Sequence, residues 1–482
     1  MNSSIDTSPG DLVTVDLEEG TGHSKHVSVT NTPAFAESTH SEGTTSSNTT
    51  STSSSSLSTI VQPWMHAWYH TTVSVLGASS AATLPYAFSL LSWPGAIIVW
   101  LFATITSYYS AQILINIQEP KMKTYSEVAN GIMGPKFANR WVRPIQIFVF
   151  LQVSIKAVLV SGKSFAILDA LFNNDEQVLS NTIWILIAGC MFYFIVLIPS
   201  IEDMWVLSLV GSIAGLIACV LFVATSAMDL ASGVVGEVDY GRPPGDKIDY
   251  TFGIFIAMSD IVLSYGGHSV LPDLQATLHE KHGDKAHASM MKALKAAYAV
   301  ISPSYLLVAV MGYVTYGSTV SPFLVDSFVN PSPALLTILN VLIVLNEFFN
   351  SAIYVQAFFT LVEDIVPSFF AERDDWTARI RCYKPTQLLM RTLTIVFSTF
   401  VAMAIPFFGS LAALTGAIGF MALTFVYPYL FWAFSSAAKK ASKLRRFLNW
   451  GLVVTFIVFG IGGAAGAIYQ IGKESSTFHF FS

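Results

Sequence analysis

Residues Tyr250–Leu278 read YTFGIFIAMSDIVLSYGGHSVLPDLQATL, an apolar segment interrupted halfway by Tyr265-Gly266-Gly267-His268. The first apolar segment, Ala67–Leu91, has its own interruption at Gly77-Ala78-Ser79-Ser80, with Pro85 one turn further on. Lipid tolerates unpaired backbone groups only where they line a cavity and find a ligand. A pair of broken hydrophobic helices at corresponding places in two halves is typical of inverted-repeat transporters. We therefore predict a binding site at mid-membrane, formed by the two breaks.

The composition is that of an integral membrane protein. The chain has 482 residues, of which 53% are apolar and only 12% are charged, whereas soluble domains carry about 25% charged residues. The net charge of −6 comes mostly from an acidic N-terminal tail, so a nucleic-acid partner is not indicated. Cys190 and Cys219 fall in apolar segments and Cys382 in a loop, which supports neither a disulfide framework nor a zinc site.

Residues 1–62 differ from the rest of the chain. Ser41–Thr59 is almost entirely Ser, Thr, Gly and Asn, so we expect this tail to be disordered. It lacks the apolar region of a signal peptide, and its seven acidic residues without any Arg are unlike a transit peptide. The predicted organisation is a cytosolic tail at 1–62, a transmembrane transport domain at 63–475 and a short C-terminal tail at 476–482.

The transport domain is predicted to be all-α, with eleven membrane-spanning helices of which the first and sixth are broken. The spans lie near residues 66–91, 94–116, 143–171, 182–199, 204–228, 251–279, 290–316, 333–362, 386–406, 409–434 and 447–471.

The basic residues of the loops set the orientation. The loops after spans two, six, eight and ten hold eighteen Lys and Arg, whereas the opposite side holds only Arg242, Lys247 and Lys473. Because cytoplasmic loops carry the excess of Lys and Arg, this alternation predicts a cytosolic N-terminus and a C-terminus outside the cell or in a lumen.

The first break has the features of an anion site. A half-helix that begins at Gly77–Ser80 would present free N–H groups and a positive dipole end, which suit a carboxylate. The hydroxyls of Ser79 and Ser80 could ligate a cation or bind the substrate. Gly77, Ala78, Ser79 and Ser80 are therefore candidate substrate-binding residues. The alternative is that these small residues only allow close helix packing.

The second break has the features of an ammonium site. Gly266 and Gly267 have weak helix propensity, so the last carbonyls of the preceding half-helix would be unsatisfied and available to an amine. Tyr265 and His268 would project near the gap. Asp260, five residues earlier, would cost about 2.5–3.5 kcal/mol at the bilayer centre and is a candidate proton carrier. The alternative for Asp260 is a structural hydrogen bond to a neighbouring helix. The alternative for His268 is a hydrogen-bonded histidine that only packs between helices.

Two opposite charges lie at similar depth in spans three and eight. At 1.5 Å per residue, Lys156 lies about 20 Å and Glu347 about 22 Å above the cytosolic edge. We hypothesise that they form an ion pair facing the substrate cavity, the alternative being two separate polar pockets. Asn346, Asn350 and Ser351 on the same span as Glu347 either line that cavity or bridge helices.

Other features of the sequence do not require a functional role. Lys163 is near the outer end of span three, where its side chain can reach the interface. The pairs Gly211/Gly215 and Gly462/Gly466 fit close helix packing. No metalloprotease, P-loop or nucleophile-elbow motif is present in a suitable context, so the chain is not predicted to be an enzyme or to need a cofactor or metal.

Together these residues resemble the amino acid/auxin permease family, and within it the lysine/histidine transporter-like branch. The matching motifs run from about residue 66 to 465: Leu84-Pro85-Tyr86-Ala87, Gly162-Lys163-Ser164, Asp239-Tyr240-Gly241, Ser259-Asp260 through Tyr265-Gly266-Gly267-His268 to Leu274-Gln275-Ala276-Thr277, and Pro406-Phe407-Phe408-Gly409.

This resemblance implies a LeuT-type five-plus-five inverted repeat with one extra helix, and secondary transport of amino acids, usually driven by protons. Asp260, Lys163 and the Gly-Gly break fall on family positions. The chain departs from the family at Ala78-Ser79-Ser80, where a Gly-x-Gly is usual, which indicates a narrower and more hydroxylated pocket. Lys156 and Glu347 also depart, and they do so together.

The sequence is thus interpreted as a proton-coupled amino acid symporter of the plasma membrane. Its predicted partners are an amino acid, a proton and the lipid bilayer. Sodium coupling through Ser79, Asn350 and Ser351, and export or vesicular loading by proton exchange, stay open as alternatives, as does a vacuolar or endosomal membrane for the location. So do a non-transporting amino acid sensor that signals through its tail, and an auxin-like organic acid as substrate.

Overall fold

The computed structural model describes residues 63–174, 176–198, 204–283, 285–329, 331–366 and 385–476. The predicted tail at 1–62 and the predicted tail at 476–482 apart from Ser476, together with Cys382 and the basic residues of the loop after span eight, lie outside these ranges. All secondary structure in the described ranges is helical. The predicted all-α fold is therefore confirmed for this part of the chain.

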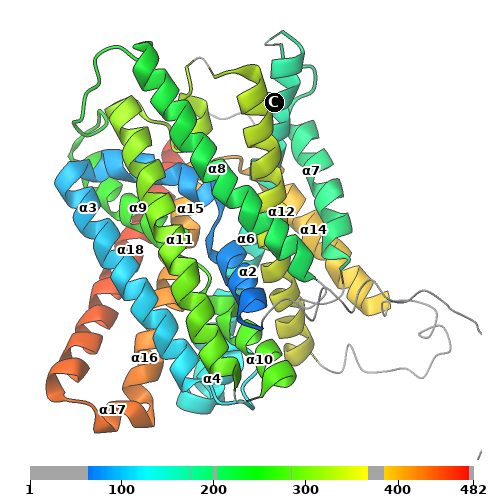
Figure 1. Ribbon diagram of the computed structural model, residues 1–482, viewed down its shortest axis with the longest axis vertical. Coiled ribbons are helices and arrows are strands. Elements are labelled where there is room, and N and C mark those ends of the chain that lie inside the picture. The colour runs from blue at the N-terminus through cyan, green and yellow to red at the C-terminus, as the bar shows by residue number, and fades with distance from the viewer. Residues whose placement is uncertain are drawn as a thin grey trace, which may run out of the picture. The chain divides into compact units, whose positions relative to one another are not determined.

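The first broken helix lies in the middle of the bundle (Figure 1). Its first half is α2 (Pro63–Val75), which packs against α8, α10, α11 and α12. The second half begins α3 (Ala78–Ile117), a 40-residue segment. At Ser92 the backbone turns through φ 58° and ψ 168°, so α3 consists of two helices. This turn separates the first two predicted spans.

The helices that form the remaining predicted spans follow those spans closely. They are α6 (Arg143–Phe172), α7 (Asn181–Val196), α8 (Trp205–Ser232), α9 (Lys247–Ser264), α10 (Leu271–His282), α11 (Lys285–Tyr316), α12 (Pro333–Ile365), α14 (Pro385–Ala404), α15 (Phe408–Leu414), η7 (Thr415–Val426), α16 (Tyr427–Phe434) and α18 (Lys443–Ser475). Short helical segments connect them: α4 (Tyr125–Met133), α5 (Pro135–Phe137), η1 (Ala138–Val142), η3 (His268–Val270), η4 (Gly317–Thr319), η5 (Leu324–Ser327) and α17 (Ser436–Lys440).

Local sequence signals explain several helix ends. The Asp246 side chain accepts hydrogen bonds from the N–H groups of Ile248 and Asp249, and the Asp249 side chain accepts one from Asp246 in return. This reciprocal cap fixes the start of α9. Proline in the first turn, where its missing N–H costs nothing, begins α12 at Pro333.

Nine helical segments in the described ranges are long and apolar enough to cross a membrane. In that assignment both halves of α3 form one segment, and α7, with 16 residues, is shorter than the others. Large apolar side chains point outward from the bundle, among them Phe194, Val220 and Ile461, each more than 60% exposed. An exposed apolar surface of this kind suits lipid. The total of eleven crossings stays a prediction.

Small residues bring the helices close together. A Cβ atom at Gly211 would lie 2.7 Å from Cγ2 of Val73. One at Gly215 would lie 2.6 Å from Nδ2 of Asn346. The predicted packing role of this pair is confirmed, and Gly466 packs in the same way against α9. As a result α8 lies directly against the first broken helix.

Candidate functional site

The first break is shorter than predicted. Only Leu76 and Gly77 lie between α2 and α3, with Gly77 in an extended conformation (φ −92°, ψ 125°). Ala78, Ser79 and Ser80 are helical and form the first turn of the second half. The break is thus a two-residue gap in which the predicted Gly77 is unwound and the three residues after it are not.

Asn346 of α12 satisfies backbone groups on both sides of this gap. Its Oδ1 accepts a hydrogen bond from the N–H of Ala78 at 2.7 Å. Its Nδ2 donates to the carbonyls of Leu76 at 3.0 Å and Gly211 at 2.9 Å. One buried amide therefore joins both halves of the first broken helix to α8.

Other side chains take the remaining carbonyls at the end of α2. The donors lie on α11 and α12, and all are buried. The bonds run from Tyr305 to the carbonyl of Val75 at 2.7 Å, from Tyr354 to that of Ser74 at 2.6 Å, and from Asn350 to that of Val73. The same Tyr305 hydroxyl accepts the N–H of Gly77 at 3.1 Å.

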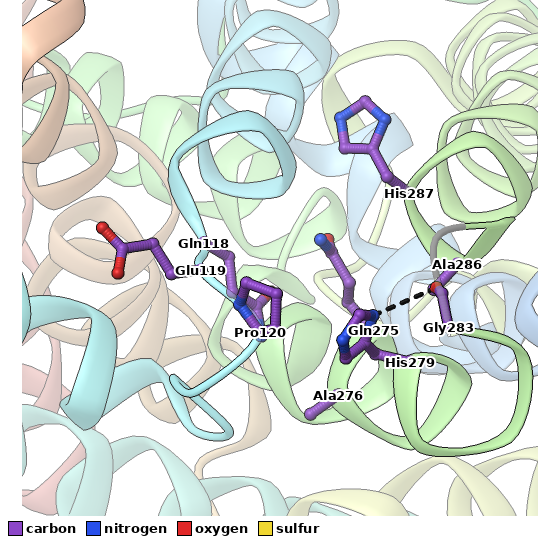
Figure 2. A pocket seen from close by; sticks show the side chains of 9 residues that line it. All are labelled: Gln118, Glu119, Pro120, Gln275, Ala276, His279, Gly283, Ala286 and His287. Atoms are coloured by element: carbon purple, nitrogen blue, oxygen red, sulfur yellow. Dashed lines mark hydrogen bonds between the residues drawn. The ribbon is translucent and has the colours of Figure 1, made fainter. Parts of the chain in front are cut away.

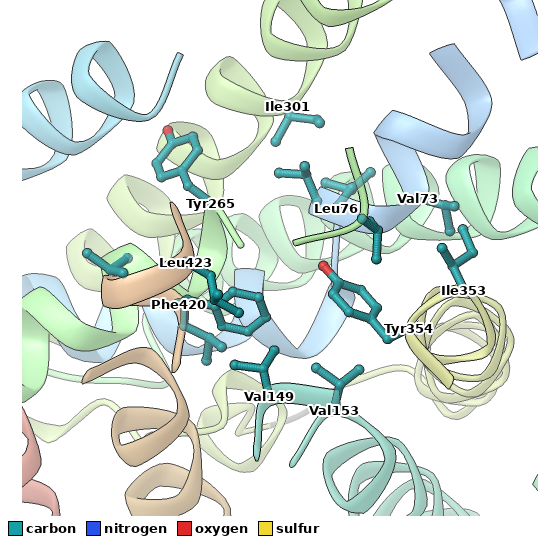
Figure 3. Packing of buried hydrophobic residues seen from close by; sticks show 14 of the residues in the cluster. Val73, Leu76, Val149, Val153, Tyr265, Ile301, Ile353, Tyr354, Phe420 and Leu423 are labelled. Carbon is teal, nitrogen blue, oxygen red and sulfur yellow. The ribbon is translucent and has the colours of Figure 1, made fainter. Parts of the chain in front are cut away.

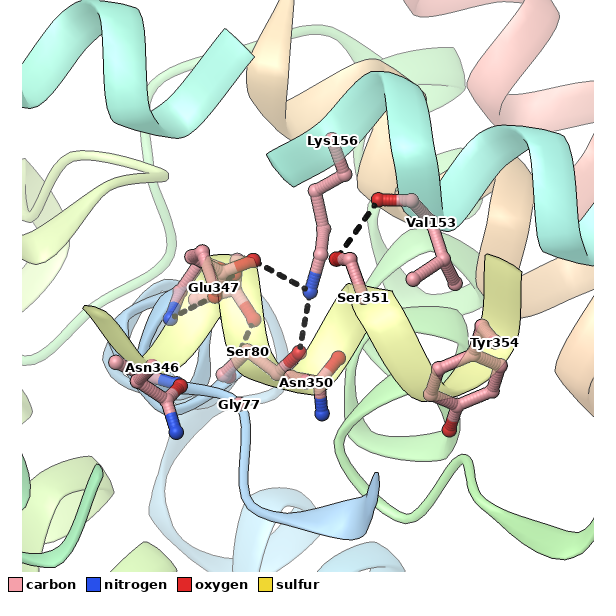
Figure 4. A network of polar contacts seen from close by, with 12 residues as sticks. Gly77, Ser80, Val153, Lys156, Asn346, Glu347, Asn350, Ser351 and Tyr354 are labelled. Carbon is pink, nitrogen blue, oxygen red and sulfur yellow. Dashed lines mark hydrogen bonds and ion pairs between the residues drawn. The ribbon is translucent and has the colours of Figure 1, made fainter. Parts of the chain in front are cut away.

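A carboxylate of the protein itself occupies the start of α3 (Figure 4). Glu347, which is fully buried, accepts hydrogen bonds at Oε1 from the N–H of Ser79 at 3.1 Å and from its hydroxyl at 2.6 Å. The other oxygen, Oε2, lies 3.4 Å from Nζ of Lys156. That ammonium also lies 3.4 Å from the hydroxyl of Ser80. The hypothesised ion pair between Lys156 and Glu347 is thus present.

These contacts correct the prediction of free N–H groups at the first break. The N–H groups of Gly77, Ala78 and Ser79 are bonded to Tyr305, Asn346 and Glu347. The physical reason is that buried backbone groups seldom stay unpaired. The helix end does favour an anion, as predicted, but the anion it holds is a side chain from α12.

The second break lies where it was predicted. Tyr265, Gly266 and Gly267 separate α9 from η3. Among the described residues, no group donates a hydrogen bond to the carbonyl of Ser264 or to that of Gly266. The C-terminal end of a half-helix carries a partial negative charge, so this end can accept an ammonium group, in contrast to the filled first break.

Tyr265 and His268 both point toward the second half of α3. The hydroxyls of Tyr265 and Thr104 are 2.6 Å apart. Nε2 of His268 lies 2.9 Å from the hydroxyl of Ser110 and 3.0 Å from the carbonyl of Ser107. Both side chains are buried. These contacts fasten the second break to its neighbouring helix, which is the packing alternative raised for His268.

The two breaks touch each other. A Cβ atom at Gly267 would lie 2.6 Å from Cγ2 of Val75, the last residue of α2. Gly266 is similarly close to the ring of Phe420. Figure 3 shows Phe420 and Tyr354 close together, with Leu76 of the first break near them. The predicted meeting point is therefore a closely packed centre.

Gly267→Ala is expected to impair uptake strongly, because its new methyl group cannot fit against Val75. Overpacking of this kind costs about 1–3 kcal/mol of stability. Thermal melting and uptake of the purified variant would measure both effects. Gly472→Ala is the matched control, since no atom lies within 4 Å of its added Cβ. Uptake by Gly267→Ala at the wild-type rate would contradict this role of the contact.

Asp260 lies one turn before the second break, buried on α9 and only 2% exposed. Its Oδ1 has no hydrogen-bond partner. Gly253 and Ile256, seven and four residues earlier on the same helix face, line a cavity of about 140 Å³ together with Tyr86. Lys473 also lines this cavity. No structural hydrogen bond of the kind offered as the alternative thus holds this oxygen of Asp260.

The other predicted polar residues bridge helices. The Ser351 hydroxyl donates to the carbonyl of Val153 on α6 at 3.2 Å, and Asn350 bonds to Val73. Lys163 forms an ion pair of 2.5 Å with Asp326 of η5. It thereby joins the C-terminal part of α6 to the segment between α11 and α12.

Sequence reasoning missed Tyr305 and Tyr354. A signal for the second was available, because Asn346, Asn350 and Tyr354 recur at intervals of four residues on one face of α12. Also missed was a cavity of about 200 Å³ between α3, α10 and α11 (Figure 2), into which the buried Gln275 points.

The site has no evident metal centre. Within the part of the chain that the structure describes, no three or more His, Cys, Asp or Glu side chains cluster so as to hold a metal ion.

Two broken helices that meet in the middle of an apolar bundle, with a buried ion pair beside them, define a membrane transporter. A family model described as "Transmembrane amino acid transporter protein" matches residues 61–472. The chain belongs to this family, and it is a transport protein rather than an enzyme.

Curated relatives cover most of the chain. GABA transporter 1 of Arabidopsis thaliana is 28% identical over 442 residues, which cover 87% of this chain and 93% of the relative. Lysine histidine transporter-like 4 of the same organism is 26% identical over 434 residues, with coverage of 85% and 90%.

Among solved structures, MhsT in complex with L-phenylalanine is similar, with a TM-score of 0.50, 11% sequence identity, and coverage of 84% of this chain and 98% of that one. A Na⁺-coupled sialic acid symporter aligns with a TM-score of 0.46 at 11% identity, covering 87% and 91%. The similarity to MhsT confirms the predicted LeuT-type fold.

Proposed function

We propose that this chain is a proton-coupled amino acid symporter that works by alternating access. The observation that supports this most is the contact between the two broken helices at Gly267 and Val75, beside which Asp260 and Glu347 are buried. Broken helices supply the helix ends to which charged substrates bind. Buried carboxyl groups in a membrane are candidates for proton carriers.

Of the two carboxyl groups, Asp260 is the better proton carrier. Glu347 accepts two hydrogen bonds from Ser79 and faces Lys156, so its charge is already compensated. Asp260 has an oxygen with no partner and lies one turn beyond residues that line a cavity. A proton on Asp260 would remove a buried negative charge and favour the loaded, closed state.

Sodium coupling is less well supported by the contacts. The three side chains considered for sodium do not converge, because Ser79 donates to Glu347, Ser351 donates to Val153, and Asn350 presents its nitrogen to Val73. The ammonium of Lys156 already supplies a positive charge beside the first break.

The relatives named for GABA and for lysine and histidine support an amino acid as substrate. We propose the plasma membrane as the location, with the N-terminus in the cytosol. Accessibility of a tag at each terminus to a protease added to intact cells would test the orientation.

The main test is uptake of labelled amino acids into liposomes that hold the purified protein. We expect accumulation above equilibrium with an inward proton gradient and none with a sodium gradient alone. Accumulation driven only by a sodium gradient would show that the coupling ion is sodium and not a proton. Folded protein that accumulates no amino acid under either gradient would contradict the proposed function.

Deletion of residues 1–62 is expected to leave the rate of proton-driven uptake within about twofold of the full chain, because every helix that the structure describes lies at or after Pro63 and chain termini are where truncation is best tolerated. The same liposome assay measures it. Full-length protein that binds amino acids but does not transport them would favour the sensor.

A further inference from the structure

The first break is already filled by the protein's own groups, which raises the question of where a substrate carboxylate binds. The N–H groups of Gly77, Ala78 and Ser79 already donate hydrogen bonds to Tyr305, Asn346 and Glu347, respectively. A substrate carboxylate could take the place of Glu347 only by stripping a fully buried charge of both its hydrogen bonds. Leaving a buried charge unpaired is strongly unfavourable.

Lys156, in contrast, has unused capacity to donate. Its ammonium carries three donors, yet its two polar neighbours, Glu347 Oε2 and the Ser80 hydroxyl, are both 3.4 Å away. Charge-assisted bonds between an ammonium and a carboxylate are about 2.7–2.9 Å long. Glu347 Oε2 accepts no hydrogen bond at this separation, so the pair is incompletely satisfied.

Because Gly77 has no side chain, the Lys156 ammonium and the Ser80 hydroxyl can both approach the first break closely. A Cβ atom there would lie 3.0 Å from the Ser80 hydroxyl and 3.6 Å from Nζ of Lys156. Figure 4 shows Lys156 reaching from α6 toward the start of α3, with Ser80 and Gly77 below its tip. A donor ammonium and a hydroxyl thus lie directly beside the first break, at the place that a side chain at position 77 would occupy.

We propose that Lys156, with the hydroxyl of Ser80, receives the carboxylate of the substrate, while Glu347 stays in place as a fixed cap of α3. This inference rests on the proposed function and assigns the carboxylate subsite of the same site. The ammonium of the substrate binds at the open carbonyl end of α9, where Ser264 and Gly266 have no partner among the described residues.

The assignment has a consequence for substrate choice. A lysine is a compact charge on a flexible four-carbon stem, so it can follow carboxylates at different distances from the amine. A fixed pair of backbone N–H groups cannot do so. The site therefore requires a carboxylate but does not require that the amine be on the α-carbon.

The test measures binding to the purified full-length protein in lipid nanodiscs. The probes are L-alanine, L-histidine and 4-aminobutyrate, each compared with its primary amide, which keeps the amine and lacks the carboxylate. Wild-type protein is expected to bind the acids at least tenfold more tightly than the amides. Lys156→Met should weaken binding of the acids at least tenfold and change binding of the amides less than twofold.

A double variant separates this role from simple compensation of Glu347. Lys156→Met with Glu347→Gln removes both charges and keeps an oxygen that can accept from Ser79, so it stays folded where the single change leaves a buried charge. We expect acid binding to be as weak in the double variant as in Lys156→Met. Recovery of wild-type acid binding would overturn the proposal, because Lys156 would then serve only to neutralise Glu347.

Two further outcomes are decisive. An equal loss for acids and amides would overturn the assignment of the carboxylate subsite, whereas failure of wild-type protein to bind any probe would count against the proposed function itself. The control is Lys121→Met with Glu119→Gln, which removes an exposed ion pair of 2.8 Å and is expected to change no affinity.

Discussion

Glu347→Ala is expected to abolish transport and to lower the free energy of unfolding by about 3–5 kcal/mol, the usual cost of breaking a buried ion pair by removing one partner. The change removes the acceptor for the N–H and hydroxyl of Ser79. It also leaves the ammonium of Lys156, only 12% exposed, without its counter-charge. Both losses fall on the first turn of α3, directly beside the first break.

Uptake into liposomes and thermal unfolding in the same lipid would measure the two effects. Glu347→Gln is the informative companion, because its amide oxygen can still accept from Ser79. We expect this variant to recover the part of the stability that comes from the Ser79 hydrogen bonds, but not the part that comes from pairing with Lys156, and to transport more than Glu347→Ala does. A Glu347→Ala protein that melts and transports like wild type would show that the buried pair has no role.

The contacts also change how a charge-swapped double variant should be interpreted. Exchanging the two residues would place an ammonium at the N-terminal end of α3, where the helix dipole already carries positive charge. The swap is therefore expected to fail even though Lys156 and Glu347 are paired. Neutralising both residues together is the appropriate test of compensation, since it makes no new repulsion at Ser79.

The sequence predicted the fold well because its signals were strong and local. Gly77-Ala78-Ser79-Ser80 and the Gly266-Gly267 pair identified the two breaks in their apolar segments, and the depth of two isolated charges correctly predicted that Lys156 would meet Glu347. The lengths of the apolar segments also predicted the bounds of the helices well. The sharp turn at Ser92 separates the first two predicted spans. Each of these inferences needed only residue type and spacing.

The partners of the backbone groups could not be predicted in the same way. Which N–H of the first break meets which side chain depends on the rotation of α12 and α11 about their axes, and spacing alone does not determine it. Asn346 and Asn350 were recognised as candidates, but whether they bridge helices or line a cavity was settled only by their contacts with Leu76 and Val73. Tyr305, which lies 228 residues from Gly77 in the chain, carried no local signal.

Asp260→Asn is expected to uncouple transport from the proton gradient while leaving substrate exchange. The asparagine has the shape of the protonated acid, so the buried site stays neutral as it would be in the loaded state. One of its atoms replaces an Oδ1 that makes no hydrogen bond, so little structure should be lost. The variant behaves as a carrier that never releases its proton.

The magnitude of this effect follows from the driving force. One proton moving down a gradient of about one pH unit contributes about 1.4 kcal/mol, which sustains up to about tenfold accumulation of a substrate carried with it. For Asp260→Asn we expect this accumulation to fall to the passive value. Counterflow, in which labelled substrate exchanges for unlabelled substrate without any gradient, should stay within about threefold of wild type.

Asp249→Asn is the matched control, because this carboxylate lies near the start of the same helix and lines the same cavity. It forms an exposed ion pair with Lys473 at 3.0 Å and can stay charged in water without a proton. Its replacement should therefore leave the accumulation ratio unchanged. If Asp260→Asn still accumulated substrate as wild type does, the proton would have to travel on another group, and Glu347 would be the remaining buried carboxylate beside the breaks. If it lost counterflow as well, Asp260 would instead serve substrate binding, since exchange needs no proton gradient.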